Sequence, residues 1–298
     1  MTRSFADALT LNLIQGGEFV VTAQCAPLCG TSANSLKTCA DVLAGVVNAV
    51  HVPECEDGIR MSALAACGHL ISAGAEPILH LLTRDMNRIA LQATLLGAAS
   101  MGVKSVLCTT GRHQTLTDSR SARGVFDIDP IQLLAIADAM RKDGMLADGR
   151  KIEGEFNVLI GTDTNPFSDP IELQVIAMEK AVAAGADFVV TQPVFKLERF
   201  DEWMGLVRER KLHERTCIIA SVMPLSSAQQ AAELARKYSH LDIGDDVISR
   251  LASSSGAQIA SETAASLKAI EGVRGICVMC DDCALAKEVI SSSGIAGS

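Results

Sequence analysis

The sequence predicts a single-domain (β/α)8 barrel that spans residues 1–298. Eight short apolar runs recur along the chain, and helical stretches lie between them. Each run is nearly continuously apolar rather than alternating, which is typical of a parallel strand buried on both faces. Regular alternation of strands and helices indicates a parallel sheet, and one barrel commonly needs a chain of this length.

The eight expected strands are residues 19–24, 46–52, 76–82, 103–110, 156–162, 186–192, 216–222 and 273–279. Helical spacing of the apolar residues is clearest over residues 86–101, 169–185 and 226–238. Glycines at positions 102, 144 and 185 mark helix ends just before the next strand or loop.

Two segments are longer than a minimal strand and helix unit requires. A polar loop, "GRHQTLTDSRSARGVFDID", follows the fourth strand and is long enough to cover a ligand. Residues 240–271 are expected to add an extra helix before the eighth strand. A doubly wound open sheet is the alternative fold, but it leaves the count of eight units unexplained.

Composition excludes several classes of function. The formal net charge is −9, and no basic run is interleaved with aromatic residues, so we expect no nucleic-acid partner. No apolar run approaches a membrane span, and the first residues are too polar for the core of a signal peptide, so we expect a cytoplasmic protein without a membrane partner. Its ten cysteines are then expected to be thiols or metal ligands rather than disulfides.

Several segments resemble methylenetetrahydrofolate reductases, most closely the short bacterial form that has only the catalytic domain. They are "GEFVVTAQCAPLCGT", "GAEPILHLLTRDMNRIALQATLLGAASMGVKSVLCTTGRH", "VFDIDPIQLL" and "AMEKAVAAGADFVVTQPVFKLERFDEW", in the family's order along the chain. The resemblance implies an oxidoreductase of one-carbon metabolism with FAD or FMN as cofactor. It would pass hydride from NAD(P)H or a partner redox protein to 5,10-methylenetetrahydrofolate and form 5-methyltetrahydrofolate. We also expect a homo-oligomer or a subunit of a complex.

The resemblance also assigns site residues at the carboxyl ends of the strands, where barrel enzymes carry their chemistry. Flavin contacts are expected at His80, Arg84, Asn87, Thr110, Gly111 and Arg112. Folate contacts are expected at Gln192, which matches the family's pterin-binding Gln, and at Asn165 and Phe195. The loop "GTDTNPFSD" is interpreted as a scaffold for substrate rather than a metal site, because its Asx and Pro residues are ordinary turn formers.

Three positions depart from the family pattern. Gln24 stands where the family has the Glu that assists protonation of the folate, and an amide cannot act as a general acid. Arg112 stands where the family has an Asp that accepts hydrogen bonds, and Pro53 replaces a Thr near the flavin. Either water or a nearby acid such as Glu54 or Glu56 supplies the proton, or the chain is a paralogue with another reaction.

A row of cysteines at the expected end of the eighth strand offers such a reaction. Barrel closure places Cys280 and Cys283 beside Cys25 and Cys29 of the first strand's loop. Four sulfurs at this spacing can bind zinc or an iron-sulfur cluster, in a folate- or corrinoid-linked methyl-transfer or electron-transfer subunit. The alternative is a purely structural role, in which cysteines take the place of Ala or Ser in the core. We expect this role for Cys39, Cys67, Cys108, Cys217 and Cys277.

Overall fold

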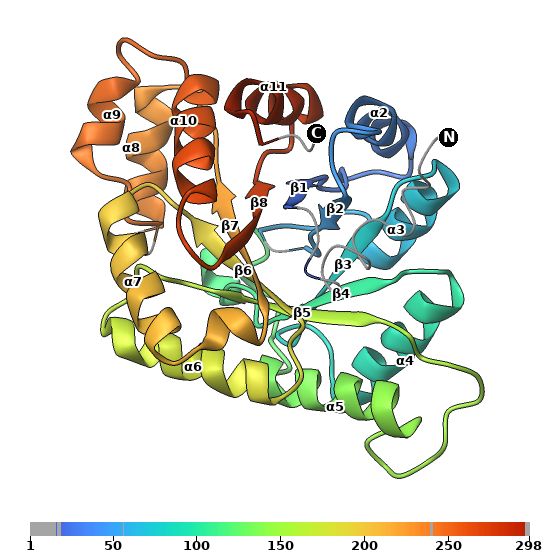
Figure 1. Cartoon of the computed structure of the whole chain (residues 1–298). Helices are drawn as coiled ribbons and strands as arrows, with labels where there is room; N and C mark the ends of the chain where they lie inside the picture. The colour runs from blue at the N-terminus through green and yellow to red at the C-terminus, as the bar shows by residue number, and fades with distance from the viewer. Residues whose placement is uncertain (1–15, 17–18, 56, 239–240, 296–298) are drawn as a thin grey trace.

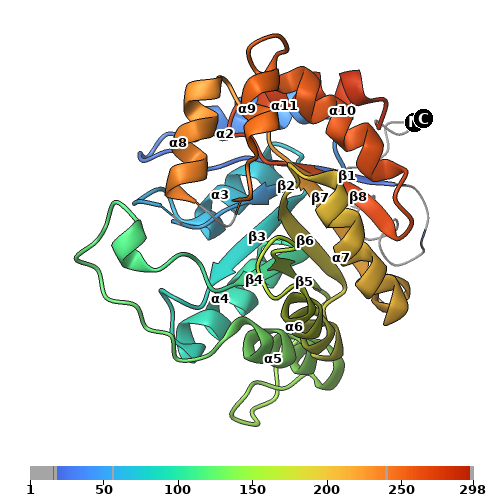
Figure 2. The same ribbon diagram turned by 90° about the vertical axis from the view of Figure 1, so that its left-hand side faces the viewer.

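The computed structural model describes residues 16, 19–55, 57–238 and 241–295. Eight parallel strands pair in sequence order, and β1 pairs with β8, so the sheet closes into a barrel. The helices surround this barrel, as Figures 1 and 2 show from two directions. The (β/α)8 fold predicted from the sequence is therefore confirmed.

All eight predicted strands are present, with ends that differ by a few residues from the expected ones. They are β1 (Val20–Gln24), β2 (Ala49–Val52), β3 (Pro77–Leu82), β4 (Ser105–Thr109), β5 (Leu159–Thr164), β6 (Phe188–Pro193), β7 (Cys217–Val222) and β8 (Val273–Val278). The longer helices are α2 (Asn34–Leu43), α3 (Ala63–Ser72), α4 (Arg88–Ser100), α5 (Pro130–Asp143), α6 (Ile171–Ala183), α7 (Leu197–Glu209), α8 (Ala228–Lys237), α10 (Gly256–Lys268) and α11 (Cys283–Ser293). Among the described residues the shorter ones are α9 (Asp245–Arg250) and the 3-10 helices η1 (Gln114–Leu116) and η2 (Leu212–Glu214).

The helix ends follow local chemistry. Helix α5 begins with a capping box, in which the Asp129 carboxylate accepts from the backbone of Gln132 and the Gln132 side chain accepts from the backbone of Asp129. Pro130 occupies its first turn, where a missing N–H costs nothing. The helix ends at Gly144, whose φ of +63° is in the left-handed region that glycine tolerates best.

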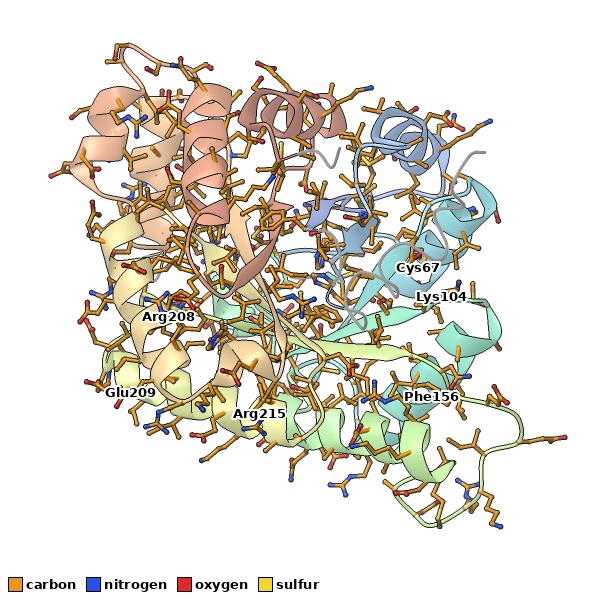
Figure 3. The ribbon with its side chains drawn as sticks, in the orientation of Figure 1. Cys67, Lys104, Phe156, Arg208, Glu209 and Arg215 are labelled. Atoms are coloured by element: carbon orange, nitrogen blue, oxygen red, sulfur yellow. A yellow bond between two sulfur atoms is a disulfide. The ribbon has the colours of Figure 1, made fainter. Side chains whose placement is uncertain are left out.

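Apolar side chains form two layers. Residues that point into the barrel, among them Val20, Ile78, Leu107 and Phe188, make a small inner core. The larger core lies between the strands and the helices, and it includes the fully buried Trp203. Cys67 of α3 belongs to this outer layer and is labelled in Figure 3.

The segment before β8 forms two helices, α9 and α10, which confirms the predicted extra helix. Together with α8 it surrounds a third, smaller apolar cluster built on Leu225, Ala231 and Val247. No helix in the described part of the chain is both long enough and apolar enough to cross a membrane.

Candidate functional site

A cavity of about 240 Å³ opens at the carboxyl ends of the strands. This is the end of the barrel at which (β/α)8 enzymes carry their active sites. Its lining is Gln24, His51, His80, Leu107, Thr109, Thr110, Gly111, Arg112, Asp163, Val190, Thr191, Gln192, Cys277 and Met279. Of the residues predicted from the sequence, Gln24, His80, Thr110, Gly111, Arg112 and Gln192 therefore meet at one cavity.

Two histidines from neighbouring strands line the inner end of this cavity. Nδ1 of His51 lies 3.1 Å from Nε2 of His80, so one ring nitrogen donates and the other accepts. Burial and the neighbouring ring hold the pKa of His51 well below its usual range, and burial lowers the pKa of His80 to about 4. The pair is therefore neutral near pH 7. Their outer nitrogens, Nε2 of His51 and Nδ1 of His80, are buried without a hydrogen-bond partner among the described residues.

Asp163 on β5 contributes a carboxylate to the cavity. The side chain is open to the cavity, yet it lies inside the barrel mouth, and desolvation there raises its pKa. The hydroxyl of Thr109 on the adjacent strand β4 donates to this carboxylate and opposes the rise. The sequence interpretation treated the loop of Asp163 as scaffold and missed this residue.

Gln24 ends β1, on the opposite side of the barrel from β5. Its amide Nε2 donates a hydrogen bond of 2.7 Å to Oδ1 of Asp281, in the loop between β8 and α11. A carboxyl group is therefore present next to the position where the amide replaces the family's Glu. Glu54, which we considered as a substitute acid, instead accepts from the backbone N–H of Ala63 at the start of α3. Glu56 lies outside the described residues.

A second cavity, of about 400 Å³, adjoins the first on the outer side and shares Gln24, Arg112, Gln192 and Met279 with it. Arg112 forms an ion pair of 2.6 Å with Asp57, and its guanidinium lies 4.0 Å from the ring centre of Tyr238. The Tyr238 hydroxyl donates to the same Asp57 carboxylate at 3.2 Å. Loops after β2 and β4 and the end of α8 are thus joined across the mouth.

Two residues expected to hold flavin have protein partners in this structure. Arg84 is 4 % exposed, and its guanidinium bonds Asp85 and the backbone carbonyls of Cys55 and Arg112. It therefore joins the loops after β2, β3 and β4. Asn87 caps α4, because its side-chain oxygen accepts from the backbone N–H groups of Ile89 and Ala90.

Two residues expected to bind folate also lie outside the lining of the two mouth cavities. Asn165 shapes its own turn by donating to Ser168 and accepting from the backbone of Phe167. Phe195 packs against the apolar cluster of Leu225 and Val247. Gln192 alone of the three predicted folate contacts lines both cavities.

The cysteines gather in a different set from the predicted one. Cys25 and Cys283 lie together, and the third member is Cys39 of α2, which we had assigned to core packing. Cys39 and Cys283 form a disulfide, which corrects the expectation of thiols or ligands alone. Cys29 is exposed, and neither it nor Cys280 belongs to this close group. The sequence could not reveal Cys39, because its place beside β1 depends on how α2 packs.

The lining of the two cavities offers little charge for a flavin nucleotide. A flavin phosphate calls for cationic side chains or free backbone N–H groups. Among the described lining residues of both cavities the cations are Arg112, which Asp57 already pairs, and Lys237, whereas Asp57, Asp163 and Glu233 are acidic. The volumes suit one drug-sized ligand rather than a flavin nucleotide beside a folate. The side chains alone therefore offer a flavin phosphate few cations, and the reaction is derived below from the chain's own residues.

Solved structures with the same fold share little sequence with this chain. An uncharacterized protein from Clostridium thermocellum that binds two copies of 5-methyl-5,6,7,8-tetrahydrofolic acid is 9% identical, with a TM-score of 0.67 over 96% of this chain and 97% of that one. Oxaloacetate acetylhydrolase, in complex with 3,3-difluorooxalacetate, is 12% identical, with a TM-score of 0.53 over 95% of this chain and 82% of that one. A 2,3-dimethylmalate lyase is 14% identical, with a TM-score of 0.55 over 97% and 84%. These likenesses show the fold alone.

Comparison of the sequence identifies a protein family, which is more specific than a shared fold. No curated protein matches the chain. The sequence pattern of the family described as methylenetetrahydrofolate reductase matches residues 50–281, which is well over half of the chain. The match runs from β2 to the loop after β8 and so includes most of the cavity lining. The chain therefore belongs to the methylenetetrahydrofolate reductase family.

Proposed function

We propose that the chain is an enzyme of one-carbon metabolism that binds a reduced folate at the barrel mouth. The observation that carries this proposal is the pair of joined cavities, with Asp163 in the inner one and cations on the outer one. A folate has the matching form, with a flat polar pterin at one end and glutamate carboxylates at the other. The fold of a protein that binds 5-methyltetrahydrofolic acid supports the same assignment.

The pterin would enter the inner cavity. Its pyrimidine edge presents N–H donors, which a carboxylate such as Asp163 accepts through two oxygens. Arg112 cannot take this part, because a guanidinium has only donors. Gln192 can both donate to and accept from the same edge, and Leu107, Val190 and Met279 offer apolar contacts to the ring faces.

The glutamate end would lie in the outer cavity. Arg112 and Lys237 line that cavity and offer positive charge to carboxylates. Arg112 already pairs with Asp57, so a ligand carboxylate would add to an existing network rather than meet a free cation. This arrangement favours selection of the direction in which the folate enters the cavities more than strong binding of its glutamate end.

Family membership supports reduction of 5,10-methylenetetrahydrofolate as the reaction. Opening the five-membered ring places a proton on N10 and leaves an iminium group at N5, and hydride from a nicotinamide or a partner redox protein then produces the 5-methyl group. Gln24 cannot donate that proton. Asp281, which accepts from Gln24 at 2.7 Å, lines neither cavity in the described part of the chain, so we assign the proton to water at the barrel mouth.

The alternative, a methyl-transfer or electron-transfer subunit that uses a cysteine-bound metal, gains no support from the cavity. Cys25 and Cys39 belong to the outer apolar layer between barrel and helices. Neither of them lines the inner or the outer cavity among the described residues. A metal there would not meet a folate held in the barrel.

Equilibrium binding of 5-methyltetrahydrofolate to wild-type protein and to Asp163→Asn tests the site. We expect binding to weaken about 10- to 100-fold in the variant, because a hydrogen bond to a charged group contributes about 1.5–3 kcal/mol. Asp169→Asn is the matched control, since that exposed carboxylate pairs with Arg199 outside the cavities. Equal binding by wild-type protein and Asp163→Asn, or no binding by wild-type protein, would overturn the proposal.

A further inference from the structure

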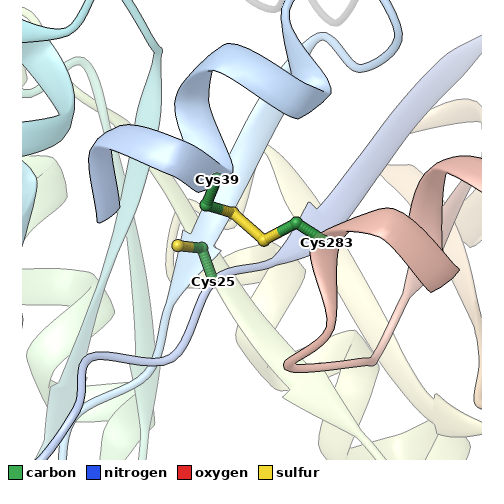
Figure 4. Close-up of side chains that lie close together, drawn as sticks. All are labelled: Cys25, Cys39 and Cys283. Atoms are coloured by element: carbon green, nitrogen blue, oxygen red, sulfur yellow. A yellow bond between two sulfur atoms is a disulfide. The ribbon is translucent and has the colours of Figure 1, made fainter. Parts of the chain in front are cut away.

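Three cysteine sulfurs from distant parts of the sequence lie together outside the barrel. Cys25 follows β1, Cys39 is in α2 and Cys283 begins α11. Their sulfur atoms all lie within 4.8 Å of one another. Figure 4 shows Cys25 beside the bond that joins Cys39 to Cys283. A disulfide needs two sulfurs, so the third one calls for a separate explanation.

We infer that the reduced protein binds one zinc ion through the thiolates of Cys25, Cys39 and Cys283. This site goes beyond the proposed function and does not depend on folate binding. It differs from the set expected from sequence, because Cys39 takes part and neither Cys29 nor Cys280 lies in the group. We name this trio the thiol group.

The geometry of the thiol group is close to what zinc requires. Zinc binds thiolate sulfur at about 2.3 Å in tetrahedral sites, so two ligand sulfurs lie roughly 3.8 Å apart. Sulfurs already within 4.8 Å need only small side-chain shifts to reach that spacing once the disulfide opens. Three protein ligands leave a fourth tetrahedral position, which water can fill.

The surroundings favour a bound cation over free thiolates. Cys25 and Cys39 are 4 % and 2 % exposed, so solvent does little to stabilise charge there. A zinc ion supplies the missing positive charge and displaces the thiol protons.

Reduction and oxidation of the Cys39–Cys283 bond convert the thiol group between two forms. A dithiol reductant gives two electrons and two protons to the Cys39–Cys283 bond, and it leaves as its own disulfide. The protein then holds three thiols, which release their protons as zinc binds. A small-molecule disulfide reverses the sequence: it accepts the two electrons from Cys39 and Cys283, takes up two protons and leaves as two thiols. The Cys39–Cys283 bond forms again and the ion is expelled, because a disulfide sulfur is no longer a thiolate ligand. The site therefore has a zinc form and a disulfide form.

The thiol group adjoins the proposed active site through the chain. Cys25 is the residue after Gln24, and Cys283 comes two residues after Asp281. The hydrogen bond between Gln24 and Asp281 thus lies between two of the three ligands. A change between the zinc and disulfide forms therefore moves Cys25 and Cys283, which are close in sequence to Gln24 and Asp281.

Zinc content after reduction is the decisive measurement. The full chain is reduced with a phosphine, incubated with Zn²⁺, freed of excess ion by gel filtration and analysed by atomic emission. We expect one zinc per wild-type chain, and a loss of most of it in Cys25→Ser and Cys39→Ser. Cys280→Ser is the matched control, a nearby cysteine outside the thiol group, and should retain the ion.

Wild-type protein gives a second measurement that needs no variant to fold. Alkylation of the folded, reduced protein with and without zinc, followed by peptide mass spectrometry, should show protection of Cys283 by zinc, because Cys283 is the partly exposed member of the thiol group whereas Cys25 and Cys39 are buried in either case. The unreduced protein should show Cys39 linked to Cys283 and should hold no zinc. Reduced protein without zinc, full zinc content in Cys25→Ser, or protection of other cysteines alone would overturn the inference.

Discussion

The side-chain amide of Gln24 donates a 2.7 Å hydrogen bond to the Asp281 carboxylate. The last residue of β1 therefore meets the loop after β8, and it does so where β1 and β8 close the barrel. The family's acid is absent from β1, but a carboxyl is present one side chain away. The Asp281 carboxyl lies outside the described lining of both cavities, and its contact with Gln24 fixes a side chain that does line them.

Replacing Gln24 with Glu tests whether the side chain at position 24 contacts Asp281. Two carboxyls would then share one position, and their repulsion would raise the pKa of one of them. A carboxyl with a raised folded pKa stabilises the folded state only at low pH, so the variant should lose about 1 kcal/mol relative to wild type as the pH rises to neutrality. Urea unfolding at acidic and neutral pH measures the difference. The double variant Gln24→Glu with Asp281→Asn should remove it, and an equal loss in the double variant would contradict the contact.

The fold was predictable because each of its signals is local. Every strand is a short apolar run, and glycines such as Gly144 end helices wherever the backbone turns left-handed. The side-chain alternation of β5 could also have located Asp163. Leu159 points into the barrel, and residues two and four positions along a strand share its face, so Asp163 does too.

Other parts of the site depend on tertiary contacts that no short pattern contains. Arg84 follows β3, where the resemblance assigns a flavin contact, and its position also lets it reach carbonyls of two neighbouring loops. A buried polar group needs hydrogen-bond partners, and the buried guanidinium of Arg84 finds them within the protein. Cys39 lies 244 residues from its partner Cys283, so their pairing depends on the packing of two helices.

The buried histidine pair makes stability depend on pH. The folded pKa of His80 is about 4 against an ordinary value of 6.5, so the unfolded chain binds more protons between these values. Stability is therefore greatest above the unfolded pKa and is lost as the pH falls towards about 4. Denaturant unfolding across this range should show a shallower fall for His51→Gln with His80→Gln than for wild type. His69→Gln, at an exposed position of α3, is the control and should match wild type.

Asn87 should prove to be a helix cap rather than a cofactor ligand. Its side-chain oxygen satisfies two backbone N–H groups at the start of α4. Asn87→Ala should lower the free energy of unfolding by about 1 kcal/mol, and Asn87→Asp should retain nearly all of it, because Asp caps helices equally well. Binding of 5-methyltetrahydrofolate should be unchanged in both variants. A variant with weaker ligand binding and unchanged stability would show that Asn87 contacts the ligand.

Asp163 should stabilise the complex and destabilise the free protein. Desolvation in the barrel mouth raises its folded pKa, so this group favours the folded state at low pH and loses that effect as the pH rises through the folded value. Above the ordinary pKa of 3.8 this shift therefore lowers the stability of the free protein. Asp163→Asn removes that charge, and its amide oxygen can still accept from Thr109.

The ligand-free Asp163→Asn variant should therefore unfold at a higher denaturant concentration than wild type at neutral pH. The difference should shrink as the pH falls from the raised folded pKa towards the ordinary value of 3.8, and it should be absent below 3.8, where both side chains are neutral. A residue kept for binding at the expense of stability behaves in this way, whereas a residue kept for the fold does not. Lower stability of the variant at neutral pH would make Asp163 a structural residue, and its effect on folate binding would then be indirect.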